Sequence, residues 1–349
     1  MGPVMPLLAV AEICRARDAA TQFVWVGTKT GPERELVEKY DIPFFVIGAG
    51  KWRRYFSLLN ILDLFKLFIA FFQSLFLLWQ EKPDLLISAG GFVSVPLHWA
   101  GALLGIPAWV HQQDIRPGLA NRLMAPFAKK ITVAVKDTAK FFSAKKTEWI
   151  GNPSRELTVE NIALAKKKFN LVEGKPVIFA LGGGTGSNYI NRIVLETLSG
   201  LPRDWQVLHL TGKERPGELA KRATGAFPNY HVYQFFNAEM AEAYAVADVV
   251  VARAGFATLA ELAALAKPAV IVPMGGTHQE DNARYFADRQ AVILLPEQID
   301  GGLKLTQIVK ELIANPTKLA RLGKRLHELL PRAKEEKILE IIAGLIECS

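Results

Sequence analysis

The stretch FALGGGTGSNYIN, residues 179–191, decides the fold of this 349-residue chain. An apolar run at 177–181 leads into the glycines, and apolar residues at helical spacing follow them, so the pattern predicts a strand, a loop and a helix. Such a loop directs free backbone N–H groups at an anion. The stretch therefore predicts a phosphate site, with an ordinary strand-to-helix turn as the alternative interpretation.

Strand-like apolar runs alternate with helical patterns along the whole chain, which predicts parallel sheets covered on both faces. The chain is long enough for two Rossmann-like α/β domains, with a ligand cleft at the carboxyl ends of their strands. The predicted domains are residues 1–152 and 153–349, and the last helix is allowed to pack back on the first domain. The predicted strands are 23–26, 44–47, 85–88, 108–111, 131–135, 177–181, 206–210, 231–233, 249–252, 269–272 and 291–294.

The charge balance favours anionic partners. The formal net charge is +8, and residues 1–150 hold 18 Lys and Arg against 12 Asp and Glu, which leaves +6 in the first half. Phosphates and an anionic membrane suit this balance, but the chain has no basic run interleaved with aromatics, so nucleic acid is not expected. Two distant cysteines, Cys14 and Cys348, indicate neither a disulfide scaffold nor a zinc site and fit a reducing cytoplasm.

The beginning of the sequence, MGPVMPLLAVAEICRAR, predicts a helix with no strand before it. A doubly wound domain starts with a strand that feeds its first glycine turn. The first domain is therefore expected to lack its first strand, or else the chain starts upstream of Met1, and we favour the second interpretation. The first ten residues carry no basic leader of the secretory kind.

The segment Ser57–Trp79 is long and apolar enough to resemble a membrane span. However, Asn60, Asp63, Lys66 and Gln73 recur at roughly helical spacing, which predicts an amphipathic helix instead. The sequence KWRRYF (51–56) precedes it, and basic and aromatic residues beside an apolar helix are typical of attachment to a membrane surface. A fully buried core helix is the alternative.

Two further segments carry candidate ligand-binding groups. In ARAGFATLAE (252–261), a turn after a strand leads into a helix, so its N–H groups and Arg253 suit a diphosphate. Glu261 would repel phosphate but suits two vicinal hydroxyls of a ribose, unless it is an ordinary capping acid. In GGTHQEDNA (275–283), side chains able to read sugar hydroxyls begin another helix.

Together, GGGTGSNYIN, ARAGFATLAE and THQEDNA resemble the donor-side motifs of the GT-B glycosyltransferases of MurG type. The segments SAGGFVSVPLHWAGALLGIPAWVHQQD (88–114) and IGNPSR (150–155) are similar to the family's second glycine loop and its interdomain motif. The resemblance covers nearly the whole chain, and its motifs are specific in combination. It implies two domains that face each other across a cleft, with the first strand of the N-terminal domain missing here.

The resemblance also implies roles for single residues. Phe236 would offer its backbone to uracil, Glu261 would hold the ribose, and Arg155 would reach the diphosphate. His278, Gln279 and Asn282 would read the sugar. The residues implied to bind UDP-N-acetylglucosamine are Arg155, Gly183, Gly184, Thr185, Gly186, Phe236, Arg253, Gly255, Thr258, Glu261, His278, Gln279 and Asn282.

On the acceptor side, the resemblance implies that Gly90, Gly91 and Asn121 meet a polyprenyl-diphosphate-linked acceptor. Asp114 is the candidate base, and His111 is the alternative base or a purely structural histidine. The sequence departs from the family where Gly184 replaces a serine and where HQQD (111–114) replaces His-Glu-Gln-Asn. Only Gly2 remains of the family's first glycine loop, and Pro3 stands where that loop has a histidine.

The implied activity is an inverting transfer of N-acetylglucosamine to lipid-linked muramyl-pentapeptide during peptidoglycan synthesis. The acceptor 4-hydroxyl attacks C1 directly, without a cofactor or a metal ion, and helix dipoles stabilise the leaving UDP. The implied location is peripheral, on the cytoplasmic face of the inner membrane. The alternatives are transfer to another lipid such as diacylglycerol, a UDP-N-acetylglucosamine 2-epimerase, and a non-catalytic binder of UDP-sugar.

Overall fold

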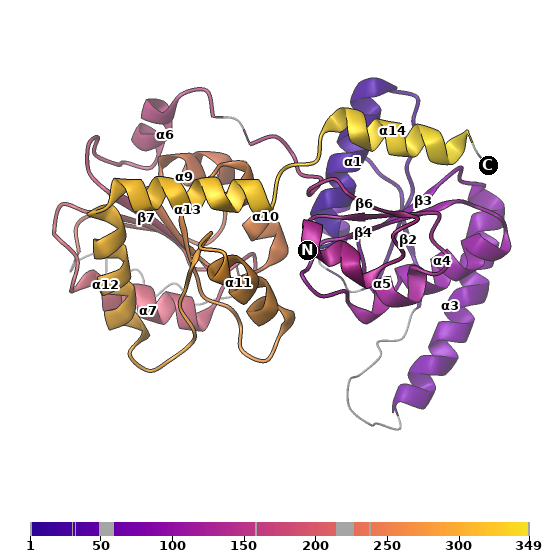
Figure 1. The fold of residues 1–349 in the computed structure, drawn as a ribbon, viewed down its shortest axis with the longest axis horizontal. Helices are drawn as coiled ribbons and strands as arrows, with labels where there is room; N and C mark the ends of the chain where they lie inside the picture. The colour runs from indigo at the N-terminus through magenta and orange to yellow at the C-terminus, as the bar shows by residue number, and fades with distance from the viewer. Residues whose placement is uncertain are drawn as a thin grey trace. The chain divides into compact units, whose positions relative to one another are not determined.

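The computed structural model describes residues 2–29, 31, 33–48, 59–157, 159–213, 227–236 and 239–347, with the backbone alone for 59–65. The chain forms two compact units (Figure 1). One comprises Met1–Arg155 with Arg332–Ser349, and the other comprises Glu156–Pro331. The chain therefore passes between the units after residue 155, slightly beyond the expected boundary at 152/153. The segment 332–349 belongs to the first unit, as was allowed for the last helix, although the predicted bounds placed it in the second domain.

The first unit has two separate parallel sheets, with strand orders β1-β2 and β3-β4-β5-β6. As the sequence predicts, the first described element is a helix and not a strand. A doubly wound order would place a first strand between β1 and β3, which is where the sheet is divided. The elements are α1 (Val4–Arg17), β1 (Trp25–Gly27), α2 (Glu33–Glu38), β2 (Phe44–Val46), α3 (Leu59–Glu81), β3 (Leu86–Ser88), α4 (Ser94–Leu103), β4 (Ala108–Gln112), α5 (Leu119–Met124), β5 (Lys130–Val133), η1 (Lys136–Phe141), β6 (Thr147–Trp149) and α14 (Glu335–Ile346).

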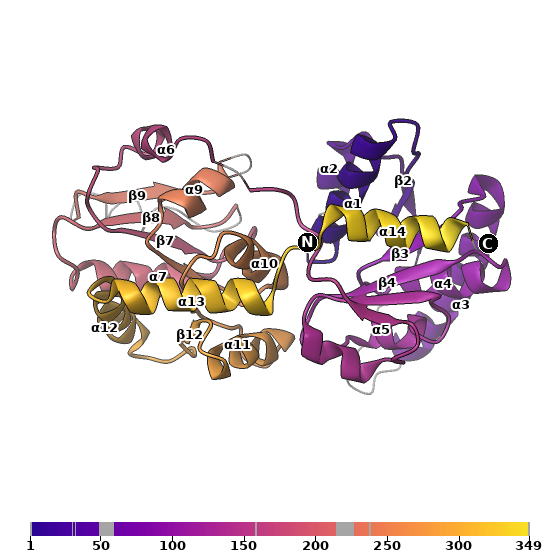
Figure 2. The ribbon, with the colours of Figure 1, turned by 45° about the horizontal axis from the view of Figure 1, so that its top comes forward.

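Alternate residues of β4 face the two sides of the larger sheet. Trp109 is fully buried in a cluster with Ile13 of α1 and Ile338 of α14. Its neighbour Val110 packs on the other side with Met124 of α5. Figures 1 and 2 both show α14 beside α1, in agreement with their contacts. The last helix thus completes the core of the first unit, which explains why it does not belong to the second.

Helix α3 is amphipathic and covers α4. Ala70, Ser74 and Leu78 are buried. Its opposite side exposes large apolar residues: Phe68, Ile69, Phe72, Phe76 and Trp79. The alternative of a fully buried core helix is therefore wrong for the part of α3 whose side chains are described. Among the described residues, no helix meets the length and hydropathy that a membrane span needs.

The second unit holds one parallel sheet of order β12-β11-β10-β7-β8-β9. The predicted strands are all present, and 177–181, 206–210 and 249–252 have the predicted bounds. The elements are α6 (Ile162–Lys168), β7 (Val177–Leu181), α7 (Asn188–Leu198), β8 (Gln206–Leu210), β9 (Tyr230–Tyr233), α9 (Met240–Val246), β10 (Val249–Ala252), α10 (Phe256–Ala264), β11 (Ala269–Ile271), α11 (His278–Asp288), β12 (Ile293–Leu294), α12 (Gly301–Ile313) and α13 (Pro316–Leu329).

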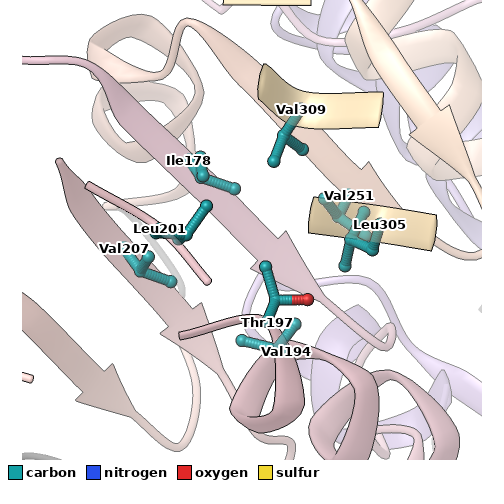
Figure 3. A pocket seen from close by; sticks show the side chains of 8 residues that line it. All are labelled: Ile178, Val194, Thr197, Leu201, Val207, Val251, Leu305 and Val309. Atoms are coloured by element: carbon teal, nitrogen blue, oxygen red, sulfur yellow. The ribbon is translucent and has the colours of Figure 1, made fainter. Parts of the chain in front are cut away.

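The core of this unit lies between the sheet and helices α7 and α12. Figure 3 shows Ile178 of β7 and Val251 of β10 facing Leu305 and Val309 of α12. The apolar cavity that these residues line has a volume of about 10 Å³, which leaves room for one water molecule at most. On the opposite face, Phe179 of β7 packs edge-to-face on Tyr244 of α9, with ring centroids 5.4 Å apart. The sheet is therefore a rigid base for the loops at its carboxyl edge.

Candidate donor and acceptor sites

The sheet of the second unit reverses its strand order between β7 and β10, since β7 pairs with both β8 and β10. All strands of this sheet are parallel, so their carboxyl ends lie at one edge. The crevice at such a reversal is where α/β sheets bind ligands. The glycine loop leaves β7 at this edge, and the turn 253–255 leaves β10 beside it. The two motifs predicted to hold a diphosphate are therefore neighbours.

Three positions of the glycine loop strongly favour glycine. Gly183 and Gly186 have φ of +87° and +81°, and a Cβ on Gly182 would lie 2.3 Å from the backbone N of Ser187. Ser187 caps α7, because its Oγ accepts from the N–H of Ile190. Gly184 and Thr185 are exposed at this helix N-terminus. The loop thus presents backbone to solvent where a helix dipole favours an anion.

Arg253 differs from its expected role. Its guanidinium is buried, donates to Ser187 Oγ at 2.7 Å and to the carbonyls of Val272 and Pro273, and pairs with Glu297 at 2.6 Å. Only its Nε–H lacks a partner among the described groups. A side chain with four such contacts is held inside the fold and is not offered to a diphosphate. Arg253 is instead a clamp between the α7 cap and the ends of β11 and β12.

Helix α10 carries the remaining diphosphate and ribose candidates. Gly255 caps it in an extended conformation, and Thr258 and Glu261 are half-buried in its first two turns. The carboxylate of Glu261 accepts a hydrogen bond from the Tyr244 hydroxyl, with 3.0 Å between Oε2 and the phenolic oxygen. Glu261 is therefore oriented by the fold and is no simple capping acid, since it lies beyond the first turn.

The sugar-reading candidates on α11 divide into two kinds. His278 is exposed at the first helical position, and half-buried Gln279 accepts from the N–H of Met274 at 3.1 Å. Asn282 is fully buried and donates to the carbonyl of Ala254 at 3.3 Å. The expectation that Asn282 reads sugar hydroxyls therefore does not fit this structure, because its amide connects α11 to the turn after β10.

Phe236 follows β9 at the same edge. Its side chain is buried against Phe169 and Tyr233, with ring centroids 5.2 and 4.8 Å away. The ring thus fixes the backbone at 236, which is what a backbone contact to uracil would need. The contact itself stays a prediction.

In the first unit, the second glycine loop follows β3. Gly90 and Gly91 have φ of +114° and +96°, so both positions favour glycine. Asn121 of α5 lies beneath the loop, and a Cβ on Gly90 would be 3.5 Å from its Oδ1. That oxygen is buried with no partner in the described part of the chain, while Nδ2 donates to Gln112 Oε1 at 2.6 Å. Gly91 is exposed and Asn121 is not, so the loop itself is the accessible acceptor candidate.

His111 and Asp114 lie at and just after the end of β4. His111 is buried, and its Nδ1 is 2.8 Å from Thr132 Oγ1. The amide oxygen Oδ1 of Asn152, 3.4 Å from Nε2, can only accept, which assigns the imidazole hydrogen to Nε2 and leaves Nδ1 to accept from the Thr132 hydroxyl. Burial lowers the pKa of His111 to about 4. A neutral, enclosed imidazole whose lone pair is already bonded does not suit the role of base, whereas Asp114 is partly accessible.

The buried histidines predict how stability depends on pH. Burial lowers the pKa of His98 and of His111 to about 4 and that of His209 to about 3. In the unfolded chain these groups bind a proton near pH 6.5. The unfolded state therefore binds more protons below pH 6.5, and the free energy of unfolding decreases as the pH falls from 6.5 towards 4.

Urea unfolding midpoints at pH 7.5, 6.0 and 5.0 check this prediction. His111→Asn removes one titrating group and should flatten the decrease. A midpoint that stays constant between pH 7.5 and 5.0 in the wild type would contradict it.

Arg155, expected to reach the diphosphate, ends the first segment of the first unit. Burial raises the pKa of Tyr40 in this unit, and the positive charge of Arg155 opposes that rise. Among the described residues, no group of three or more His, Cys, Asp or Glu side chains could hold a metal ion.

Sequence reasoning missed the supporting groups Ser187, Tyr244 and Asn152. Ser187 alone had a local signal, a serine directly before a helical pattern.

Comparison with known proteins agrees with this architecture. Residues 1–133 match the N-terminal domain of glycosyltransferase family 28, and residues 177–337 match its C-terminal domain. A UDP-N-acetylglucosamine–N-acetylmuramyl-(pentapeptide) pyrophosphoryl-undecaprenol N-acetylglucosamine transferase of Clostridium perfringens is 31% identical, over 96% of this chain and 95% of its own. The transferase of the same name from Staphylococcus aureus is 36% identical, over 83% of this chain and 82% of its own.

Solved structures show the same GT-B architecture. The crystal structure of Acinetobacter baumannii MurG has a TM-score of 0.76 and 25% identity, and covers 97% of this chain and 95% of its own. The UDP-GlcNAc 2-epimerase of Neisseria meningitidis also matches, with a TM-score of 0.67 over 97% of this chain and 96% of its own. At 13% identity, that likeness shows the fold alone. The predicted fold class is confirmed, and the chain belongs to glycosyltransferase family 28.

Proposed function

We propose that this glycosyltransferase moves N-acetylglucosamine from UDP-N-acetylglucosamine to the 4-hydroxyl of a lipid-linked muramyl-pentapeptide. The observation that carries the proposal is the pair of helix N-termini, α7 and α10, beside each other at the strand reversal of the second unit. They can hold a diphosphate while Glu261 takes the ribose hydroxyls. The names of the relatives specify the same donor and acceptor.

The reaction balances without a further reactant. The acceptor 4-hydroxyl attacks C1 of the sugar, the C1–O bond to UDP breaks, and the configuration at C1 inverts. The electron pair leaves with the diphosphate, where the glycine-loop N–H groups and the helix dipoles stabilise the added charge. Asp114 takes the hydroxyl proton in this proposal, since His111 is enclosed. Arg155 adds a charge-assisted bond to the diphosphate.

An acceptor-dependence assay tests the function. UDP release is measured with UDP-N-acetylglucosamine alone, with lipid-linked muramyl-pentapeptide added, and with diacylglycerol added. The proposal expects release only with the muramyl-pentapeptide lipid. Release with diacylglycerol would point to another acceptor, and conversion of the UDP-sugar to its 2-epimer without acceptor would point to an epimerase.

We also propose that the first unit binds the cytoplasmic face of the membrane as a peripheral protein. The exposed apolar side of α3, residues 68–79, supports this proposal, because ordered aromatic rings lie on it. Phe68 and Phe72 stack edge-to-face at 4.9 Å, and Phe76 and Trp79 lie 6.4 Å apart. The basic residues Lys51, Arg53 and Arg54, expected to contact anionic lipid, lie outside the described residues, as do the neighbouring aromatics.

Phe76→Ser should reduce binding to anionic vesicles about tenfold, since burying one large apolar side chain contributes about 1.5 kcal/mol or more. Binding should also fall as salt rises, through screening of the basic residues. Sedimentation with phosphatidylglycerol-containing vesicles measures both effects. Leu303→Ser, at a 72% exposed position in α12, is the matched control and should bind as wild type does. Equal loss in both variants would mean that α3 is not the contact surface.

A further inference from the structure

Tyr244 occupies an unusual place for a core aromatic residue. It lies on α9, it is fully buried, and its ring packs on Phe179 of the central strand β7. Yet its hydroxyl donates to Oε2 of Glu261, which belongs to a different helix and is half-buried. A buried phenol needs a partner for its hydroxyl, and here the partner is the proposed ribose acceptor.

The contact limits how the Glu261 carboxylate can lie. A glutamate side chain has several rotatable bonds, and ordering them when a ligand binds costs free energy. The Tyr244 ring is fixed by its packing on Phe179. Its hydroxyl is therefore fixed too, and the hydrogen bond holds Oε2 of Glu261 at one position. A carboxylate has about four acceptor sites, so the bond from Tyr244 does not by itself prevent Glu261 from accepting from both hydroxyls of a vicinal diol.

We propose that Tyr244 is a positioning residue that preorganises Glu261 for the two ribose hydroxyls of the nucleotide. The inference rests on the proposed role of Glu261. Because its side chain is fully buried, Tyr244 itself does not touch the ligand. Its effect is specific: it strengthens binding of nucleotides that have both hydroxyls and leaves binding of nucleotides without them unchanged.

The test compares UDP with 2′,3′-dideoxy-UDP by calorimetry on the full chain. The measured quantity is the dissociation constant of dideoxy-UDP divided by that of UDP. Tyr244→Phe keeps the buried ring and removes only the hydroxyl. It should weaken UDP binding about tenfold, because the freed Glu261 side chain must then be ordered when the nucleotide binds, with little change for the dideoxy nucleotide. The ratio then falls about tenfold. In a Glu261→Ala background, Tyr244→Phe should change nothing further.

Tyr230→Phe is the matched control. Tyr230 is equally buried, and its hydroxyl bonds to His209 instead of a carboxylate, so its removal should leave the ratio unchanged. If Tyr244→Phe keeps the wild-type ratio while Glu261→Ala lowers it, Tyr244 is core packing only and the inference is wrong. If Glu261→Ala keeps the wild-type ratio, the ribose role of Glu261 fails and the inference fails with it. Either result requires measurable UDP binding, so it can be told apart from a variant that no longer binds UDP.

Discussion

Arg253→Met should lower the free energy of unfolding of the second unit by about 3 kcal/mol, because removing one partner of a buried polar network leaves the others unsatisfied. Methionine fills similar space but donates no hydrogen bond to Ser187 or to the carbonyls of Val272 and Pro273. Glu297 is partly exposed, so solvent screens its ion pair and the pair contributes little of this cost. UDP affinity should fall as well, because the α7 cap loses its support.

Urea unfolding of the full chain and UDP calorimetry measure the two effects of Arg253→Met. Arg253→Lys should rescue neither, since one ammonium cannot reach partners that lie in several directions as a planar guanidinium does. Glu297→Gln is the control and should cost well under 1 kcal/mol, as exposed ion pairs do. If Arg253→Met weakened UDP binding with no change in the unfolding midpoint, the residue would be a direct phosphate ligand after all.

Glu261→Ala should weaken UDP binding about 100-fold, since two hydrogen bonds from the ribose to a charged acceptor contribute about 1.5 kcal/mol each. The fold should persist, because Glu261 is only half-buried and a buried tyrosine hydroxyl left without its partner costs about 1–3 kcal/mol, a fraction of a typical free energy of unfolding. Calorimetry with UDP measures the affinity, and thermal unfolding reports on the fold. Glu280→Ala, an exposed acid in the first turn of α11, is the matched control and should bind UDP normally. Unchanged UDP affinity in Glu261→Ala would exclude the ribose contact.

The strands were predictable because continuous apolar runs are buried on both faces of a parallel sheet. The exception is β6, Thr147–Trp149, which is short, polar and at a sheet edge, so no run of apolar residues marks it. The position of 332–349 was only partly predictable, because the sequence allowed the last helix to pack on the first domain without deciding it. The apolar pattern of α14 shows that it must pack, but only the complementary surface of α1 and Trp109 determines on which unit.

The site residues divide in the same way. The loop glycines with a left-handed backbone or a close approach were predictable, whereas Gly184 and Gly255 have room for a side chain. The roles of Arg253 and Asn282 were not, because a polar side chain at a strand end can point to solvent or back into the fold. The direction is decided by distant partners such as Glu297 and Ala254. His111 shows the same effect, since its burial depends on Thr132 and Asn152.

Because residues 332–349 belong to the first unit, that unit cannot complete its core until the ribosome has made the end of the chain. The second unit, 156–331, is one uninterrupted segment, so it can complete its core while the chain is still emerging. The first segment of the first unit emerges earlier, but Trp109 and Ile13 stay uncovered until Ile338 and Ile341 have been made. The half of the molecule made first is therefore finished last, and until then its apolar surface is open to chaperones or to the membrane.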